Sequence, residues 1–157
     1  MTPIQPITAA GFAALRTEYE QLMSVERPAI VEIVSWAAGN GDRSENGDYI
    51  YGRQKLRAID RRAGFLAKRM KAVTIVKPGE GERDAVRFGA TVIVADDDDL
   101  ERRLTIVGDD EAEAGQGRIG WGSPLARALR GARVGDVRTV NLPGGEKNWE
   151  VIEIAYE

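Results

Sequence analysis

Two acidic side chains, Asp42 and Glu45, stand three residues apart in a stretch of the chain that is rich in turn-forming residues. On a helix or a near-helical turn, residues at this spacing share a face, with Cβ atoms roughly 5–6 Å apart. Two carboxylates so placed can share one hydrated Mg²⁺, an ion that is usually held by one or two carboxylates together with phosphate oxygens. The pair therefore indicates metal-assisted phosphoryl transfer as one chemistry for this segment.

The same two residues also have a purely structural interpretation. An Asp followed three positions later by a Glu is a capping box, in which Asp42 would cap the helix backbone and Glu45 would reach back to it. Both acids would also suit the positive end of a helix dipole. The two interpretations are compatible, because an exposed cap still presents a free carboxylate oxygen.

Basic residues follow the acidic pair. Residues 50–73 contain eight Lys or Arg residues and a single acid. Arg53, Arg57 and Arg61 are successive i+4 neighbours, which would form a stripe along one side of a helix. Such a stripe suits a nucleic-acid backbone, although many charged helix faces are only solvated. The predicted nucleic-acid-binding residues are Arg53, Lys55, Arg57, Arg61, Arg62, Lys68 and Arg69.

Apolar residues at alternating steps of three and four predict two helices that pack against each other. The first run is Phe12, Leu15, Tyr19, Leu22, Glu26, Ala29, Ile33 and Trp36, and the second is Tyr49, Gly52, Leu56, Ile59, Ala63, Leu66, Met70 and Val73. Glu26 and Gly52 interrupt the pattern, and Pro28 should remove a backbone hydrogen bond and bend the first helix. Because residues 40–47 are mostly turn formers, we expect an antiparallel coiled-coil hairpin with the acidic pair at its tip.

The hydrophobic period changes to that of β-strands in the second half of the chain. Strands are predicted at residues 91–95, 100–107, 137–142 and 149–154, and a short helix from Ser123-Pro124 to residue 129. A Pro/Gly-rich segment at residues 77–81 marks a boundary. The expected fold class is α+β, with an N-terminal hairpin in residues 1–77 and a small antiparallel β-sheet domain with one short helix in residues 78–157.

The composition excludes several kinds of chemistry. The chain of 157 residues has no Cys and no His, which removes disulfides, thiol nucleophiles, zinc ribbons and Ser-His or Cys-His arrangements. The net charge of −3 divides into +4 for residues 1–78 and −7 for residues 79–157, which suggests two modules with different partners. No apolar stretch approaches the ~18 residues of a membrane span, and no secretory signal is visible, so the expected location is the cytoplasm.

Four segments resemble the Gre transcript-cleavage factors, and the GreB branch in particular. Residues 36–49, with the sequence WAAGNGDRSENGDY, are similar to the tip of that family's hairpin, which has a Gly-Asp-x-x-Glu-Asn core. Residues 56–62 are similar to its second helix. Residues 123–136 and 142–154 are similar to its C-terminal domain. The segments occur in the family's order, and the resemblance covers nearly the whole chain.

This resemblance implies a bacterial transcription elongation factor. In the family, the hairpin enters the secondary channel of a backtracked RNA polymerase, where the tip acids, matching Asp42 and Glu45, help to hold the second Mg²⁺ and its water while the extruded RNA is cleaved. The factor lends these residues in trans, is not an enzyme by itself and binds no cofactor alone. The basic stripe is expected to contact the RNA. The C-terminal domain is FKBP-like in fold and docks on the polymerase, with Ser123 and Pro124 as candidate contacts.

The resemblance has a departure, and the sequence leaves rival functions open. Gly47 stands where the family commonly has Ala, which should loosen the start of the second helix by roughly 1 kcal/mol. The rivals are a channel-binding regulator that inhibits or modulates polymerase without cleavage, a peptidyl-prolyl isomerase or chaperone, and a coiled-coil adaptor. An isomerase needs an aromatic-lined pocket, for which the second half offers Phe88, Trp121, Trp149 and Tyr156. Because the seam is satisfied within one chain, we expect a monomer.

Overall fold

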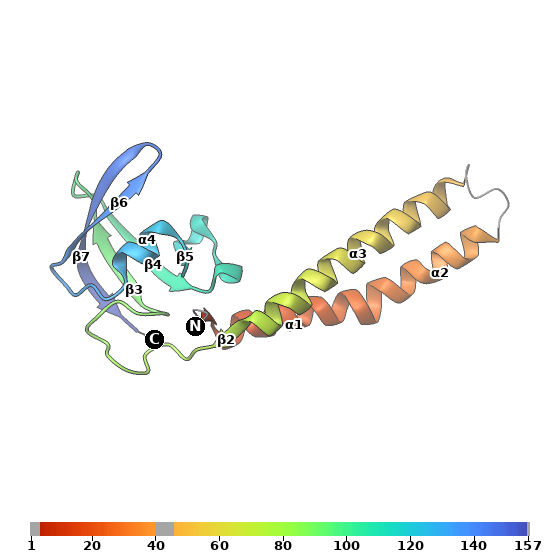
Figure 1. The fold of residues 1–157 in the computed structure, drawn as a ribbon, viewed down its shortest axis with the longest axis horizontal. Helices are drawn as coiled ribbons and strands as arrows, with labels where there is room; N and C mark the ends of the chain where they lie inside the picture. The colour runs from red at the N-terminus through yellow and green to blue at the C-terminus, as the bar shows by residue number, and fades with distance from the viewer. Residues whose placement is uncertain (1–3, 40–45, 157) are drawn as a thin grey trace. The chain divides into compact units, whose positions relative to one another are not determined.

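The structure, a computed structural model, describes residues 4–39 and 46–156. The chain forms two compact units, one of residues 12–72 and the other of residues 1–11 together with 73–157. The first unit is a helical hairpin and the second contains a mixed β-sheet, so the predicted α+β class is confirmed (Figure 1). The predicted domain division after residue 77 stays a prediction.

The helical unit has two arms that lie side by side (Figure 1). The first arm consists of α1 (Ala9–Gln21), a π-helical turn η1 (Leu22–Glu26) and α2 (Arg27–Ala38), and the second arm is α3 (Gly47–Ala72). In α3 the predicted seam is confirmed, because Gly52, Ile59, Ala63 and Leu66 are all buried. With 26 residues, α3 is roughly 39 Å long at the α-helical rise of about 1.5 Å per residue.

The π-helical turn changes which residues of the first arm face the second. Arg27 donates its N–H to the carbonyl oxygen of Leu22, five residues back, so this turn holds one residue more than an α-helical turn. Pro28 follows directly, and in a regular α-helix its ring would meet the carbonyl group four residues earlier. Up to the turn the predicted seam holds, since Leu15 and Leu22 are buried.

Beyond the turn the seam is displaced by one residue. The predicted seam residues here, Ala29, Ile33 and Trp36, are exposed. Their successors, Ile30, Val34 and Ala37, are half-buried or buried instead. The seam prediction for this segment was wrong, because one inserted residue rotates every later side chain by about 100° around the helix axis.

Close packing explains the glycine that interrupts the seam of α3. A Cβ atom added at Gly52 would lie 2.8 Å from Cγ2 of Val34, so the absence of a side chain lets α2 and α3 approach. Arg27 Nε also donates to Asp60 Oδ1 at 2.8 Å and joins the two arms at the surface. The hairpin is therefore held by a seam in which the displaced residues of α2, such as Val34, pack against the predicted seam of α3.

The second unit is built on a five-stranded sheet with the order β5-β4-β3-β7-β6. Its elements are β3 (Thr91–Ala95), β4 (Glu101–Val107), the 3₁₀ turns η2 (Asp109–Glu111) and η3 (Ala114–Gln116), β5 (Arg118–Gly120), α4 (Pro124–Leu129), β6 (Val137–Leu142) and β7 (Gly145–Ala155). All four predicted strands and the predicted helix are present. The sheet is mixed rather than purely antiparallel, because the unpredicted strand β5 runs parallel to β4.

A small parallel pair connects the two ends of the helical segment to the sheet unit. Strand β1 (Gln5–Ile7) precedes α1 and pairs with β2 (Val73–Ile75), which follows α3. The Glu111 carboxylate accepts hydrogen bonds from the N–H groups of Thr8, at 3.1 Å, and Gly108, at 2.9 Å. These contacts place residues 5–8 in the sheet unit, an arrangement that hydrophobic periodicity did not reveal.

Candidate functional site

The predicted catalytic residues Asp42 and Glu45 lie outside the described residues, which end at residue 39 and resume at residue 46. The structure describes the two helix ends that flank them. Asn46, directly after Glu45, accepts a hydrogen bond from the Tyr49 N–H on its Oδ1 at 3.2 Å. Its Nδ2 donates to the carbonyl oxygen of Ala37 at 2.6 Å. One side chain thus bonds a backbone donor at the start of α3 and a backbone acceptor in the last turn of α2.

Asn46 is the N-cap of α3, since the helix begins at Gly47 and the cap bonds the N–H of the third helical residue. A capping box built on Asp42 and Glu45 would instead begin the helix at residue 43. The capping-box hypothesis concerns residues outside the described ranges and stays a prediction. The sequence analysis missed Asn46, although an Asn directly before a helical run is a strong N-cap signal.

The seven predicted RNA-binding residues divide between two sides of α3. Opposite the buried seam lie Arg53, Arg57, Arg61 and Lys68, which are all exposed and which we call the basic outer face. On the flank, at intervals of seven, lie Lys55, Arg62 and Arg69. The structure therefore gathers four of the seven on one face and turns three toward a side of the hairpin.

Arg62 and Arg53 have hydrogen-bond partners within the hairpin. Arg62 donates from Nε and Nη2 to the two carboxylate oxygens of Glu18 in α1, at 2.6 and 2.8 Å. The hydrogen bond from Arg62 lowers the pKa of Glu18 below its ordinary value, the Arg62 charge acts in the same direction and burial opposes both. Arg53 Nη1 donates to the Tyr49 hydroxyl at 3.0 Å. Arg62 thus joins the two arms, whereas Arg53 stays on the outer face.

The predicted polymerase contacts Ser123 and Pro124 begin helix α4. Ser123 is its N-cap and accepts a hydrogen bond from the Ala126 N–H on Oγ at 3.3 Å. Pro124 occupies the first helical position, where the missing N–H costs nothing, and its side chain is exposed. These contacts explain both residues structurally, and their role in docking stays a prediction.

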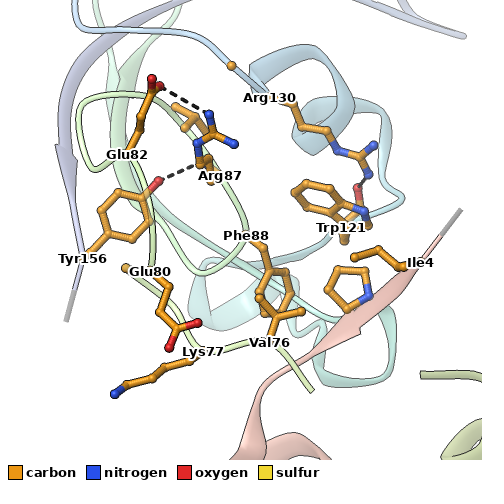
Figure 2. Close-up of a pocket in the computed structure, with 14 residues that line it drawn as sticks. Ile4, Val76, Lys77, Glu80, Glu82, Arg87, Phe88, Trp121, Arg130 and Tyr156 are labelled. Atoms are coloured by element: carbon orange, nitrogen blue, oxygen red, sulfur yellow. Dashed lines mark hydrogen bonds and ion pairs between the residues drawn. The ribbon is translucent and has the colours of Figure 1, made fainter. Parts of the chain in front are cut away.

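Figure 2 shows an aromatic-lined cavity of about 340 Å³ in the sheet unit. Phe88 and Trp121 pack edge to face with ring centroids 6.0 Å apart. Tyr156 also lines the cavity, and its hydroxyl accepts a hydrogen bond from the Arg87 N–H at 2.9 Å. Three of the four aromatic residues named for an isomerase therefore meet at one pocket, whereas Trp149 is buried in the core.

Two further observations apply to residues 4–39 and 46–156. Within these ranges no three acidic side chains gather as a set of metal ligands. The same ranges hold no helix with the length and apolar composition that crossing a membrane requires.

Family profiles match both units of the chain. Residues 5–75 match the family described as "Transcription elongation factor, N-terminal". Residues 80–156 match the family described as "Transcription elongation factor, GreA/GreB, C-term". The chain belongs to the GreA/GreB family. The predicted resemblance to Gre factors is thereby confirmed.

Individual relatives of this Gre-family chain agree with the profiles. "Transcription elongation factor GreB" of Neisseria meningitidis serogroup B is 52% identical, over 96% of this chain and 93% of the relative. The GreB of Yersinia pestis is 45% identical, over 96% and 88%. A solved structure, the crystal structure of GreA factor homolog 1 from Thermus thermophilus, is 23% identical to this chain. The match covers 98% of this chain and 99% of that protein, with a TM-score of 0.45.

Membership in the Gre family does not by itself assign roles to residues. The tip acids Asp42 and Glu45, the basic residues of α3 and the Ser123-Pro124 contact stay predictions. The hairpin end held by Asn46 is the described feature closest in sequence to the acids.

Proposed function

We propose that this chain binds bacterial RNA polymerase and stimulates cleavage of backtracked nascent RNA by supplying Asp42 and Glu45 to the polymerase active site. The observation that carries the proposal is the hairpin end, where Asn46 ties α3 to the last turn of α2 in the position directly after Glu45. The acids are thus attached to a helix end that is held by two side-chain hydrogen bonds. The printed name of the relatives, transcription elongation factor, supports the process.

The chemistry assigned to the acids is metal-assisted hydrolysis of a phosphodiester. Mg²⁺ of the polymerase, when bound, polarises the phosphate and lowers the pKa of water. Asp42 and Glu45 would bind and orient it, since carboxylate oxygens are ligands that Mg²⁺ prefers. One water is consumed, the bond between phosphorus and O3′ breaks, O3′ takes up a proton, and the released fragment keeps a 5′ phosphate. The chain lends these carboxylates in trans and is not an independent enzyme.

The basic outer face is assigned to the extruded RNA. Arg53, Arg57, Arg61 and Lys68 are exposed on the side of α3 away from the seam, so a phosphate chain can follow them without disturbing the packing of the two arms. The proposed partners are therefore the polymerase and the RNA 3′ segment, the proposed state is a monomer, and the proposed location is the cytoplasm, where the polymerase acts.

The test is RNA cleavage in a stalled, backtracked elongation complex with Mg²⁺. The double variant Asp42→Asn/Glu45→Gln keeps the shape of both side chains and removes their charge. We expect it to bind the polymerase like the wild type and to cleave roughly 10- to 100-fold more slowly, or not at all. Asp48→Asn is the matched control, because Asp48 is an exposed acid in the first turn of α3 just beyond the cap.

The outcomes separate the proposal from its rival. Loss of cleavage in the double variant but not in Asp48→Asn supports the metal-sharing role of the tip. Unchanged cleavage in the double variant would remove the acids from the mechanism. If the wild type binds the polymerase and cleaves nothing, the chain is a channel-binding regulator and the proposal is wrong.

A further inference from the structure

The exposed apolar residues of the first arm form a continuous row. Val25, Ala29, Ile33 and Trp36 follow one another at intervals of four, four and three residues, which places them on one side of the arm. We name these four residues the apolar stripe. Solvent reaches 55% of Val25, 45% of Ile33 and 63% of Trp36. The stripe ends at Trp36 in the last turn of α2, three residues before the first described range ends at residue 39.

The π-helical turn is the reason why the stripe faces outward. Without the inserted residue, three of its members would occupy the seam against α3, as their spacing predicts. With it, Ile30, Val34 and Ala37 occupy the seam, and the described part of the hairpin leaves the stripe uncovered. A row of apolar residues at three- and four-residue intervals is the pattern by which helices bind protein grooves, and an exposed Trp is the residue most typical of a binding hot spot.

Charge decides which class of partner the stripe fits. Glu32 is the only charged residue between positions 28 and 38, so α2 itself offers no cation for a phosphate. The cations on this side of the hairpin, such as Lys55 and Arg62, belong to the flank of α3, and Arg62 is paired with Glu18. The outer face of α3 carries Arg53, Arg57, Arg61 and Lys68 on the other side of the hairpin. Each face lies away from the common seam, so the two arms present chemically different surfaces. An RNA chain fits the basic face, and an uncharged apolar protein surface fits the stripe.

We propose that the apolar stripe seats the hairpin against an apolar protein wall of RNA polymerase while the basic outer face remains turned to the RNA. This inference rests on the proposed function and adds to it the surface that orients the hairpin. A rod that enters a channel can rotate about its long axis, and contact along one side removes that freedom. Trp36 and Ile33 are the anchors, because they are the large stripe residues nearest the acidic pair.

The test measures the cleavage rate in backtracked complexes as a function of factor concentration. Ile33→Ala/Trp36→Ala removes the anchors from an exposed face, and Leu100→Ala is the matched control because 64% of Leu100 is exposed in the sheet unit. We expect the double variant to raise the half-saturating concentration about tenfold or more, the scale of a hot-spot residue. The cleavage rate of the double variant at saturation and its helical content by circular dichroism should equal those of the wild type. A Trp36→Phe variant, which keeps an aromatic ring, should have most of the wild-type affinity.

Other results would overturn this inference. Suppose that Ile33→Ala/Trp36→Ala keeps the wild-type affinity while Asp42→Asn/Glu45→Gln abolishes cleavage in the same assay. The stripe then does not bind the polymerase, and the proposed function is unaffected. If the acidic double variant cleaves normally, the proposed function itself fails. If the wild type sediments as a dimer at micromolar concentration and Ile33→Ala/Trp36→Ala sediments as a monomer, the stripe binds a second copy of this chain instead.

Discussion

The side-chain amide of Asn46 donates a hydrogen bond to the Ala37 carbonyl oxygen at 2.6 Å and so connects the two arms where the hairpin ends. The same side chain caps α3 through the Tyr49 N–H. Helix ends need partners for their terminal backbone donors and acceptors, and here one side chain bonds one of each. Asn46 directly follows Glu45 in the sequence, so it is the first described residue after the acidic pair.

Replacing Asn46 with Ala should destabilise the hairpin. The variant loses the N-cap of α3, which costs about 1 kcal/mol, and it leaves the Ala37 carbonyl oxygen without its side-chain partner. The free energy of unfolding, measured by denaturant titration of the helical signal, should fall by about 1–2 kcal/mol. Asn46→Asp is the control, because its carboxylate keeps the acceptor for Tyr49 and lacks the donor for Ala37. If both variants are as stable as the wild type, neither hydrogen bond holds the hairpin end.

Gly52→Ala should destabilise the hairpin even though Ala is the better helix former. The gain in helix propensity is about 1 kcal/mol, whereas the new Cβ would lie 2.8 Å from Cγ2 of Val34, and overpacking of this kind costs about 1–3 kcal/mol. Val34 is β-branched and has little rotamer freedom with which to move away. Thermal unfolding would show a lower midpoint for Gly52→Ala.

Two further variants make the glycine experiment decisive. Gly64→Ala adds the same methyl group to the same helix where nothing lies within 4 Å, so it should stabilise by up to about 1 kcal/mol. Gly52→Ala/Val34→Ala should lose less stability than the two single changes added together, because the new methyl group fills space that Val34 vacates. Stabilisation by Gly52→Ala equal to that by Gly64→Ala would contradict the close approach at Val34.

The Glu18–Arg62 pair predicts a pH-dependent contribution to hairpin stability. The pKa of Glu18 is lowered in the folded state, so its stabilisation is present above the unfolded pKa of about 4.3 and disappears as the pH falls through the folded value. Glu18→Gln should therefore cost a few tenths to about 1 kcal/mol at pH 7, as is typical of partly exposed pairs, and almost nothing at a pH well below that window.

The measurement for this pair is the unfolding free energy of wild type and Glu18→Gln across the acid range. Glu20→Gln removes an exposed acid from the same helix and should show no such convergence. A difference between wild type and Glu18→Gln that is constant with pH would mean that the charge of Glu18 contributes nothing.

The basic outer face predicts a change in salt dependence. Arg57→Gln/Arg61→Gln removes two exposed charges of the face without altering the seam, and it should weaken cleavage at low factor concentration. The slope of log affinity against log salt should decrease by about 0.7 for each phosphate of a single strand that the variant no longer neutralises. Lys55→Gln, which removes a charge from the flank of α3, is the variant for comparison with the outer face. An equal salt slope for wild type and Arg57→Gln/Arg61→Gln would exclude phosphate binding by Arg57 and Arg61.

Much of the hairpin was readable from the sequence because helical spacing is a local property. The seam of α3, from Gly52 to Leu66, followed from steps of three and four residues. Strands β3, β4, β6 and β7 and helix α4 followed from local strand, turn and cap signals, whereas β1, β2 and β5 were not predicted. The acidic pair and the grouping of basic residues on α3 are also features of spacing. Motif resemblance supplied the family, which the profile matches then confirmed.

The tertiary structure decided what depends on contacts between distant residues. The sequence by itself determined that Trp36 lies on an apolar row, but only the five-residue step from Leu22 to Arg27, taken where Pro28 cannot continue a regular helix, turned that row outward. Likewise, only the meeting of two helix ends showed that Asn46 caps α3 and bonds α2. Periodicity fixes the relative angle of side chains within one uninterrupted helix, whereas an inserted residue and a cap shared between helices are set by packing against a second element.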